Sequence, residues 1–130
     1  MPTHAINIGY EEVGTNDNVS QAVNITADGK INEGVISVPS ESADLQVIQS
    51  IDVSQLKSLM LLSTVDMTIE TNDGTTPADT LTLAANVPLL WFEGCGFDNP
   101  LTTDVTALFL TTGDVGEGTL TMRGLMDLTP

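Results

Sequence analysis

The chain has 130 residues, of which 41% are hydrophobic, and its 18 acidic and 3 basic side chains give a net charge of −15 at pH 7. This length fits one domain that can bury a core without disulfide or metal staples, and the aliphatic content excludes a disordered acidic tail. Because the acids are spread along the chain and the basic residues form no patch, we expect no binding to nucleic acid or to anionic membranes.

The N-terminal segment alternates apolar with polar or small residues. Ile6, Ile8 and Tyr10 show the pattern, and Val23 and Ile25 repeat it after a polar stretch. Such alternation is typical of antiparallel strands with one buried and one solvated face. We expect residues 1–15 to form an extended N-terminal arm. We expect no signal peptide and no membrane span, because the chain starts without a charged or apolar region and its apolar runs are short.

The next segments predict a hairpin, a helical turn and a central strand. Asp28 and Gly29 lie between two β-capable stretches and predict a two-residue hairpin turn. Residues 52–57 begin with a capping aspartate and predict a single helical or 3-10 turn. The unbroken apolar run Leu59–Leu62 then predicts a central strand that is covered on both faces.

The C-terminal half continues the alternation, with apolar residues at positions 65, 67, 69, 81, 83, 120 and 122. Residues 72–74, with Pro77, break the chain between strands predicted near 65–71 and 79–84. Four of the five aromatic residues lie between Trp91 and Phe109, which predicts that the C-terminal half carries the best-packed core or, as the less favoured alternative, an intersubunit contact. Seven to nine short strands predict an all-β fold, an antiparallel β-sandwich of jelly-roll or Greek-key type. Residues 1–130 form this single domain, with at most one short helical turn.

The residues that carry catalysis in other proteins occur here without the patterns that activate them. His4 is the only histidine of the sequence, and nothing near it resembles a nucleophile elbow. Cys95 lies between two glycines, but its charged neighbours Glu93 and Asp98 are acidic and disfavour a reactive thiolate. The adjacent acids Glu11 and Glu12 point to opposite faces of a strand. We therefore predict no catalytic residues, and a protein that is not an enzyme.

Oxygen-rich loops raise the alternative of calcium binding. They are residues 16–18, residues 72–74 with Asp79, and residues 98–99 with Asp104. Calcium takes oxygen ligands from irregular loops, but aspartate and asparagine are also ordinary turn residues, and none of these loops has the EF-hand pattern. We favour turns, and we predict no metal ligands and no cofactor-binding residues.

The C-terminal two-thirds of the chain resembles the small β-sandwich proteins that decorate or cement the capsids of tailed bacteriophages. The segments that carry the resemblance are DVSQLK (52–57), STVDMTIETN (63–72), PADTLTL (77–83), VPLLW (87–91), NPLTTDVTA (99–107) and LTMRGLMD (120–127). They contain no catalytic signature, and no functional residue is transferred from the family by position.

The resemblance implies a virion structural protein, a capsid decoration protein that binds and stabilises the head shell. It implies the major capsid protein as partner, a homo-oligomer with a trimer favoured, and no small-molecule substrate. It also implies synthesis in the cytoplasm of the host bacterium and a final location on the capsid surface. A heterologous contact that closes into a ring would build such a trimer.

Two other functions fit an acidic β-sandwich. A carbohydrate- or receptor-binding module uses the same architecture, and Trp91 would be its first candidate for stacking on a sugar. This tryptophan lies inside the apolar run 87–92, which favours its burial. A tail or neck component of the virion differs from a decoration protein mainly in its copy number.

Overall fold

The structure is a computed structural model that describes residues 1–31, 34–113 and 116–129. These residues form eleven strands and one 3-10 turn, so the fold is all-β as predicted, with more strands than the expected seven to nine. The described residues contain no helix with the length and hydropathy that a membrane crossing requires. The elements are β1 (Thr3–Glu11), β2 (Asn18–Thr26), β3 (Gly29–Ile31), β4 (Val35–Val38), β5 (Leu45–Ile51), η1 (Val53–Gln55), β6 (Leu56–Ser63), β7 (Met67–Thr71), β8 (Thr80–Leu83), β9 (Leu89–Phe92), β10 (Val105–Thr111) and β11 (Gly118–Met126).

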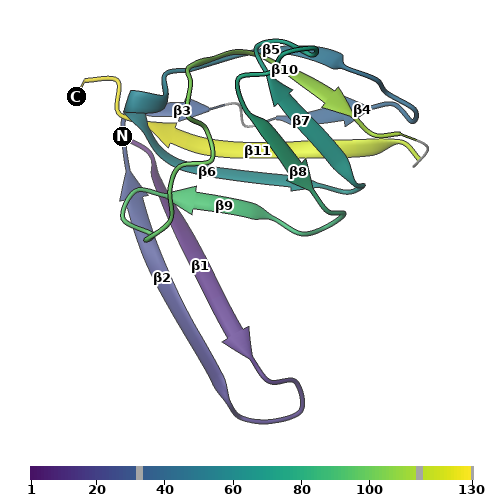
Figure 1. Cartoon of the computed structure of the whole chain (residues 1–130). Helices are drawn as coiled ribbons and strands as arrows, with labels where there is room; N and C mark the ends of the chain where they lie inside the picture. Colours follow the sequence, from purple (N-terminus) through teal and green to yellow (C-terminus); the bar gives the residue numbers. More distant parts are fainter. Residues whose placement is uncertain (32–33, 114–115, 130) are drawn as a thin grey trace.

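The body of the molecule is a sandwich of two antiparallel sheets. One sheet has the order β5-β10-β7-β8, and we call it sheet C. The other, sheet B, has the order β3-β11-β6-β9, with β4 also paired to β11. Figure 1 shows β11 and β6 running side by side beneath β7 and β8. The predicted antiparallel β-sandwich is confirmed.

The core between the sheets is aliphatic. Sheet B contributes Leu59 and Leu61 of β6, and sheet C contributes Ile69 and Leu110, all of them buried. β6 is central in its sheet, as the apolar run predicted, but only one of its faces is fully covered. Met60 and Leu62 point outward and remain partly exposed. The expectation that this strand is covered on both faces is therefore wrong.

The aromatic residues lie at the margin of this core. Trp91 is half-buried against the core, and its indole N–H donates a hydrogen bond to the carbonyl oxygen of Phe97 at 3.0 Å. Phe92 and Phe109 are half-buried as well, and the Phe97 side chain is 83% exposed. Most buried apolar residues of the described chain nevertheless belong to its C-terminal half, from Met67 to Leu125, so this half contributes the larger part of the core, through aliphatic side chains and not through aromatic rings.

The predicted turn at Asp28 and Gly29 does not close a hairpin. β2 ends just before these residues and pairs with β1, whereas β3 begins at Gly29 and pairs with β11. The Asp28 carboxylate instead accepts hydrogen bonds from the backbone N–H of Leu128 at 2.7 Å and from the Thr129 hydroxyl at 3.3 Å. The side chain that suggested a turn therefore fixes the C-terminal segment beside β3.

The predicted helical turn is confirmed as η1. The Asp52 side chain accepts a hydrogen bond from the backbone N–H of Ser54 at 3.0 Å, which is the bond that an N-cap residue makes. The turn leads directly into β6. The capping aspartate thus marks the point where the chain crosses from sheet C to sheet B.

The hairpin of β1 and β2 projects from one end of the sandwich, as Figure 1 shows. We call residues 3–26 the arm. Its two strands form a ladder of nine residue pairs, from Thr3 opposite Thr26 to Glu11 opposite Asn18, without a bulge. Residues 1–15, for which an extended arm was expected, form β1 and the first part of the turn into β2.

Candidate binding surface

The two faces of the arm differ in chemistry. The alternation of each strand places one set of side chains on a single face, which is apolar except for His4 and Gln21. We call it the apolar arm face: His4, Ile6, Ile8, Tyr10, Val19, Gln21, Val23 and Ile25. Across the ladder Ile6 lies opposite Val23, and Tyr10 lies opposite Val19. The opposite face carries small and polar residues, such as Asn7 and Ser20. The arm therefore has the pattern of a sheet with one face to bury.

The apolar arm face becomes more exposed with distance from the body. Ile6 and Val23 near the base are half-buried, whereas Ile8 is 46%, Val19 is 68% and Tyr10 is 83% exposed. A two-stranded hairpin without packing on one face is only marginally stable in water. The outer part of this face is thus an apolar surface that none of the described residues covers.

A groove of about 560 Å³ lies between the base of the arm and the outer face of sheet B. On the sheet side, three side chains from neighbouring strands stand in one row: Arg123 of β11, Met60 of β6 and Leu90 of β9. Met60 lies directly opposite Arg123 on one side and Leu90 on the other. On the arm side, His4 and Ile6 line the groove. Its walls combine aliphatic side chains with the polar residues Thr3, Asn7 and Ser58, and the Arg123 guanidinium stands at one end of the row.

Arg123 is bonded to carbonyl oxygens. Its Nη1 donates to the oxygen of Met122 at 3.0 Å and to that of Gly34 at 3.4 Å. Within the described part of the chain, no carboxylate forms an ion pair with it. A guanidinium presents five N–H donors, and the two hydrogen bonds that join Arg123 to described residues both come from Nη1.

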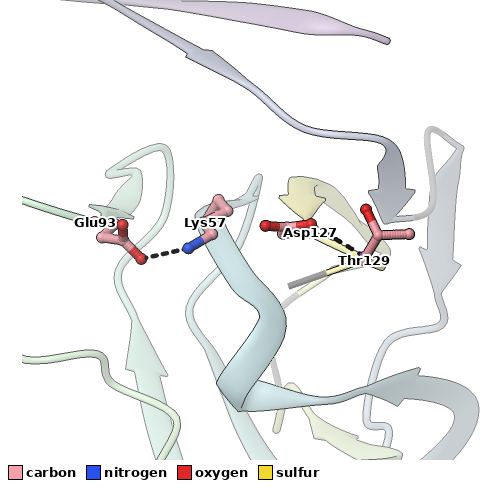
Figure 2. Close-up of polar contacts among 4 residues, drawn as sticks. All are labelled: Lys57, Glu93, Asp127 and Thr129. Atoms are coloured by element: carbon pink, nitrogen blue, oxygen red, sulfur yellow. Dashed lines mark hydrogen bonds and ion pairs between the residues drawn. The ribbon is translucent and has the colours of Figure 1, made fainter.

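Lys57 differs from Arg123 because a carboxylate already neutralises it. Its Nζ lies 2.8 Å from Oε2 of Glu93, and Figure 2 shows the ammonium directed at this carboxylate, with Asp127 farther away. The hydrogen bond to Glu93 raises the pKa of Lys57, and the charges of Glu93 and Asp127 act in the same direction. The Asp127 side chain also accepts a hydrogen bond from the backbone N–H of Thr129 at 3.1 Å.

The tip of the arm is acidic. Glu11 ends β1, Glu12 begins the turn, and Asp17 ends it. The turn is closed by backbone hydrogen bonds from Glu12 N–H to the Asp17 oxygen at 3.0 Å and from Thr15 N–H to the Glu12 oxygen at 3.3 Å. Tyr10 and Val13 are exposed beside these charges. The arm thus ends in carboxylates next to apolar side chains.

The loops considered for calcium form a hydrogen-bond network. Asn72 accepts from the Thr106 N–H at 2.8 Å and donates to the Asp104 carbonyl oxygen at 2.8 Å. The Asp79 carboxylate accepts from the N–H and the hydroxyl of Thr102 at 2.9 and 2.7 Å. The loops around residues 72–79 and 98–106 are therefore joined, through amide and hydroxyl donors.

Asp73 and Asp17 lie in turns. The Asp73 carboxylate accepts from the N–H of Thr75 at 2.8 Å and of Thr76 at 3.3 Å, and these hydrogen bonds lower its pKa. The backbone N–H of Asp17 donates a hydrogen bond to the Thr15 hydroxyl oxygen at 3.1 Å. Among the residues that the structure describes, no three His, Cys, Asp or Glu side chains gather closely enough to hold a metal ion.

The other residues singled out in the sequence lie apart. His4 is half-buried in the groove, opposite Ile25. The Cys95 thiol is partly exposed in the loop after β9, 3.7 Å from the Phe97 carbonyl oxygen. His4 belongs to β1, whereas Cys95 lies in the loop after β9. Trp91, the candidate sugar platform, has its ring against the core.

Sequence reasoning identified the alternation of the arm strands but missed their role. The apolar residues at positions 6, 8, 10, 23 and 25 look like those of any half-buried strand. The row of Arg123, Met60 and Leu90 joins three segments and depends on strand register, which the sequence alone does not give. No protein-family model, no curated protein and no solved structure matches the chain.

Proposed function

We propose that this chain is a bacteriophage virion structural protein, a capsid decoration protein that binds and stabilises the head shell. The observation that carries the proposal is the arm, an apolar-faced hairpin held away from a stable sandwich, on a chain that resembles such proteins in its C-terminal two-thirds. A decoration protein needs a rigid body and surfaces that contact other subunits, and it needs no reaction centre.

The body offers surfaces for the shell. Ile48 on the edge strand β5 is 76% exposed, and Phe97 in the loop after β9 is exposed as well. Edge strands β5, β8 and β9 have backbone groups on one side that no strand of their own sheet occupies. An added strand from the major capsid protein would pair with such an edge by β-augmentation. The acidic surface would face solvent, because a charge of −15 gives no attraction to packaged DNA.

The copy number of the protein in purified virions tests this proposal. Quantitative mass spectrometry against the major capsid protein should give one copy per capsid subunit or another simple lattice ratio. A handful of copies would instead assign the protein to the tail or neck. Its absence from virions would refute the proposal.

The resistance of the shell to heat provides the second test. Capsids that lack the protein should release DNA at a lower temperature, and adding the purified protein back should restore the original temperature. An unchanged release temperature would contradict a stabilising role. The variant Ile48→Asp should reduce rebinding. Ser37→Asp adds the same charge at an exposed position of β4, in the other sheet, and serves as its control.

A further inference from the structure

We propose that the apolar arm face of one copy packs on the outer face of sheet B in a second copy, with the acidic arm tip beside Arg123 of that copy. The contact concerns two copies of this chain in solution. It therefore goes beyond the proposed role on a capsid and does not depend on it.

The arm needs a cover that its own body does not provide. Ile8, Tyr10 and Val19 expose about half or more of their side chains on one face. Burying such side chains removes apolar surface from water and thereby stabilises a contact. The same burial would stabilise the hairpin itself, which is marginal when alone.

The outer face of sheet B has the matching chemistry. The row of Met60 and Leu90 is apolar, and Leu90 is 38% exposed. Three neighbouring strands spaced about 4.8 Å apart make this row about 10 Å wide, which is enough for the two strands of a hairpin. Arg123 at the end of the row faces a groove in which no described carboxylate pairs with it.

Charge complementarity identifies the occupant as a second copy. Glu11, Glu12 and Asp17 place carboxylates at the arm tip, next to the exposed apolar side chains. A segment that combines apolar residues with carboxylates is what a groove with aliphatic side chains and one guanidinium would bind. Every copy carries both the arm and the groove, so the contact can be repeated by each copy.

The arm cannot cover its own groove. Its base forms one wall of that groove, and the tip lies at the other end of an unbroken ladder of nine pairs. From His4 to Tyr10 the strand extends by about 20 Å at about 3.4 Å per residue. A tip that folded back onto Arg123 of the same copy would have to break this ladder.

Salt distinguishes a second copy from a basic partner. Two chains that each carry a charge of −15 repel one another at long range. Added salt screens this repulsion, so self-association should become tighter between low and physiological ionic strength. A basic partner would bind more weakly over the same change.

The first experiment compares two arm variants of the full chain by sedimentation velocity and light scattering. Val19→Asp adds a charge on the apolar arm face, and Ser20→Asp adds the same charge at the next residue, on the opposite face. Wild type and Ser20→Asp should associate in the micromolar range, and Val19→Asp should associate at least tenfold more weakly. Equal association of the two variants, or a wild type that stays monomeric at all concentrations, would overturn the proposal.

The second experiment exchanges the charges of the contact. Arg123→Glu alone and Glu12→Arg alone should each weaken association, although the first makes the net charge more negative than that of the wild type and the second makes it less negative. The double variant has the net charge of the wild type and should restore association. Arg123→Glu combined with Glu117→Arg has the same net charge and should not restore it, because Glu117 lies outside the arm. Restoration by both double variants, or by neither, would contradict the assigned pairing. Circular dichroism checks that each variant is folded.

These outcomes are separate from those of the virion tests. An arm contact that fails in solution leaves a lattice copy number and a shell effect intact. A protein that is absent from virions can still associate through its arm.

Discussion

The arm and the body use the same sequence pattern with opposite results. In β7, alternation buries Met67, Ile69 and Thr71 between two sheets. In β1, the same alternation leaves Ile8 and Tyr10 exposed on one face of a two-stranded ladder. Period-two alternation specifies which side chains share a face, but it does not specify what covers that face. The difference teaches that an alternating strand can be completed by another molecule.

The two regions also differ in how they are held. In the body, hydrogen bonds connect loops that are far apart in the sequence. The Asp79 carboxylate, for example, accepts a hydrogen bond from the hydroxyl of Thr102, 23 residues away. Within the arm, the hydrogen bonds run between β1 and β2, inside their turn, or inside β2, where Gln21 Nε2 donates to the Ala22 oxygen at 3.2 Å. The bond from Ala27 N–H to the Pro2 oxygen at 3.3 Å lies just beyond the base of the arm. The body is therefore expected to unfold cooperatively, and the arm is expected to open locally.

Amide hydrogen exchange should show the largest contrast. Arm amides should exchange through local opening, whereas the central strands β6 and β11 should exchange only through global unfolding. The free energies of opening should differ by about 5 kcal/mol, since small domains have total stabilities of roughly 5 to 15 kcal/mol. If the arm contacts a second copy, its protection should rise with protein concentration. Equal protection of arm and body in dilute protein would contradict the comparison.

The second-largest contrast between the body and the arm should come from the introduction of a charged side chain. Leu61→Asp places an unpaired carboxylate in the core, where the native side chain is only 3% exposed, and should cost about 4 kcal/mol or prevent folding. Val19→Asp makes a similar change on the exposed arm face. Urea titrations of the monomer should show a change within about 0.5 kcal/mol for Val19→Asp. Similar losses in both variants would mean that the arm is part of the core.

A methyl group added at glycine should have an intermediate effect. At Gly124 of β11, a Cβ atom would lie 2.6 Å from the Ile31 Cδ1 and 2.8 Å from the backbone oxygen of Ser58, so Gly124→Ala should cost about 1 to 3 kcal/mol. At Gly9 of β1, a Cβ atom would have no neighbour within 4 Å. Gly9→Ala should leave the melting temperature of the body unchanged. A stable Gly124→Ala protein would show that β11 can shift away from β3 and β6.

The smallest effect should come from the ion pair of Lys57 and Glu93 at the edge of sheet B. Because the pKa of Lys57 in the folded state is raised above 10.5, its stabilising contribution is complete below that pH and is lost as pH rises through the folded-state pKa. Near neutral pH, Lys57→Met should therefore have a free energy of unfolding about 0.5 kcal/mol lower than wild type, as is typical of surface ion pairs, and a slightly lower melting temperature. The two melting curves should converge at high pH. A constant difference at all pH values would assign the effect to packing of the side chain.

The sequence was sufficient for the strand character of most elements, because alternation and turn residues act locally. It predicted the two strands β7 and β8 with the break between them, the turn capped by Asp52 and the central position of β6. It failed at Asp28, since the bonding partner of that carboxylate lies 100 residues away. The sequence also did not predict the candidate binding surface. Arg123, Met60 and Leu90 come together only through register, and the exposure of the arm depends on what the rest of the chain leaves uncovered.

The bond between Asp28 and the C-terminal segment has a mechanical consequence. Asp28 follows the last strand of the arm by two residues and is bonded to Leu128, and β3 directly after it is paired with the end of β11. A pull on the arm is therefore transmitted into the longest strand of the body. The load enters through a short three-pair ladder at one edge of sheet B, so the junction should fail before the sandwich does. A subunit strained through its arm would then yield at this joint while its core stays folded.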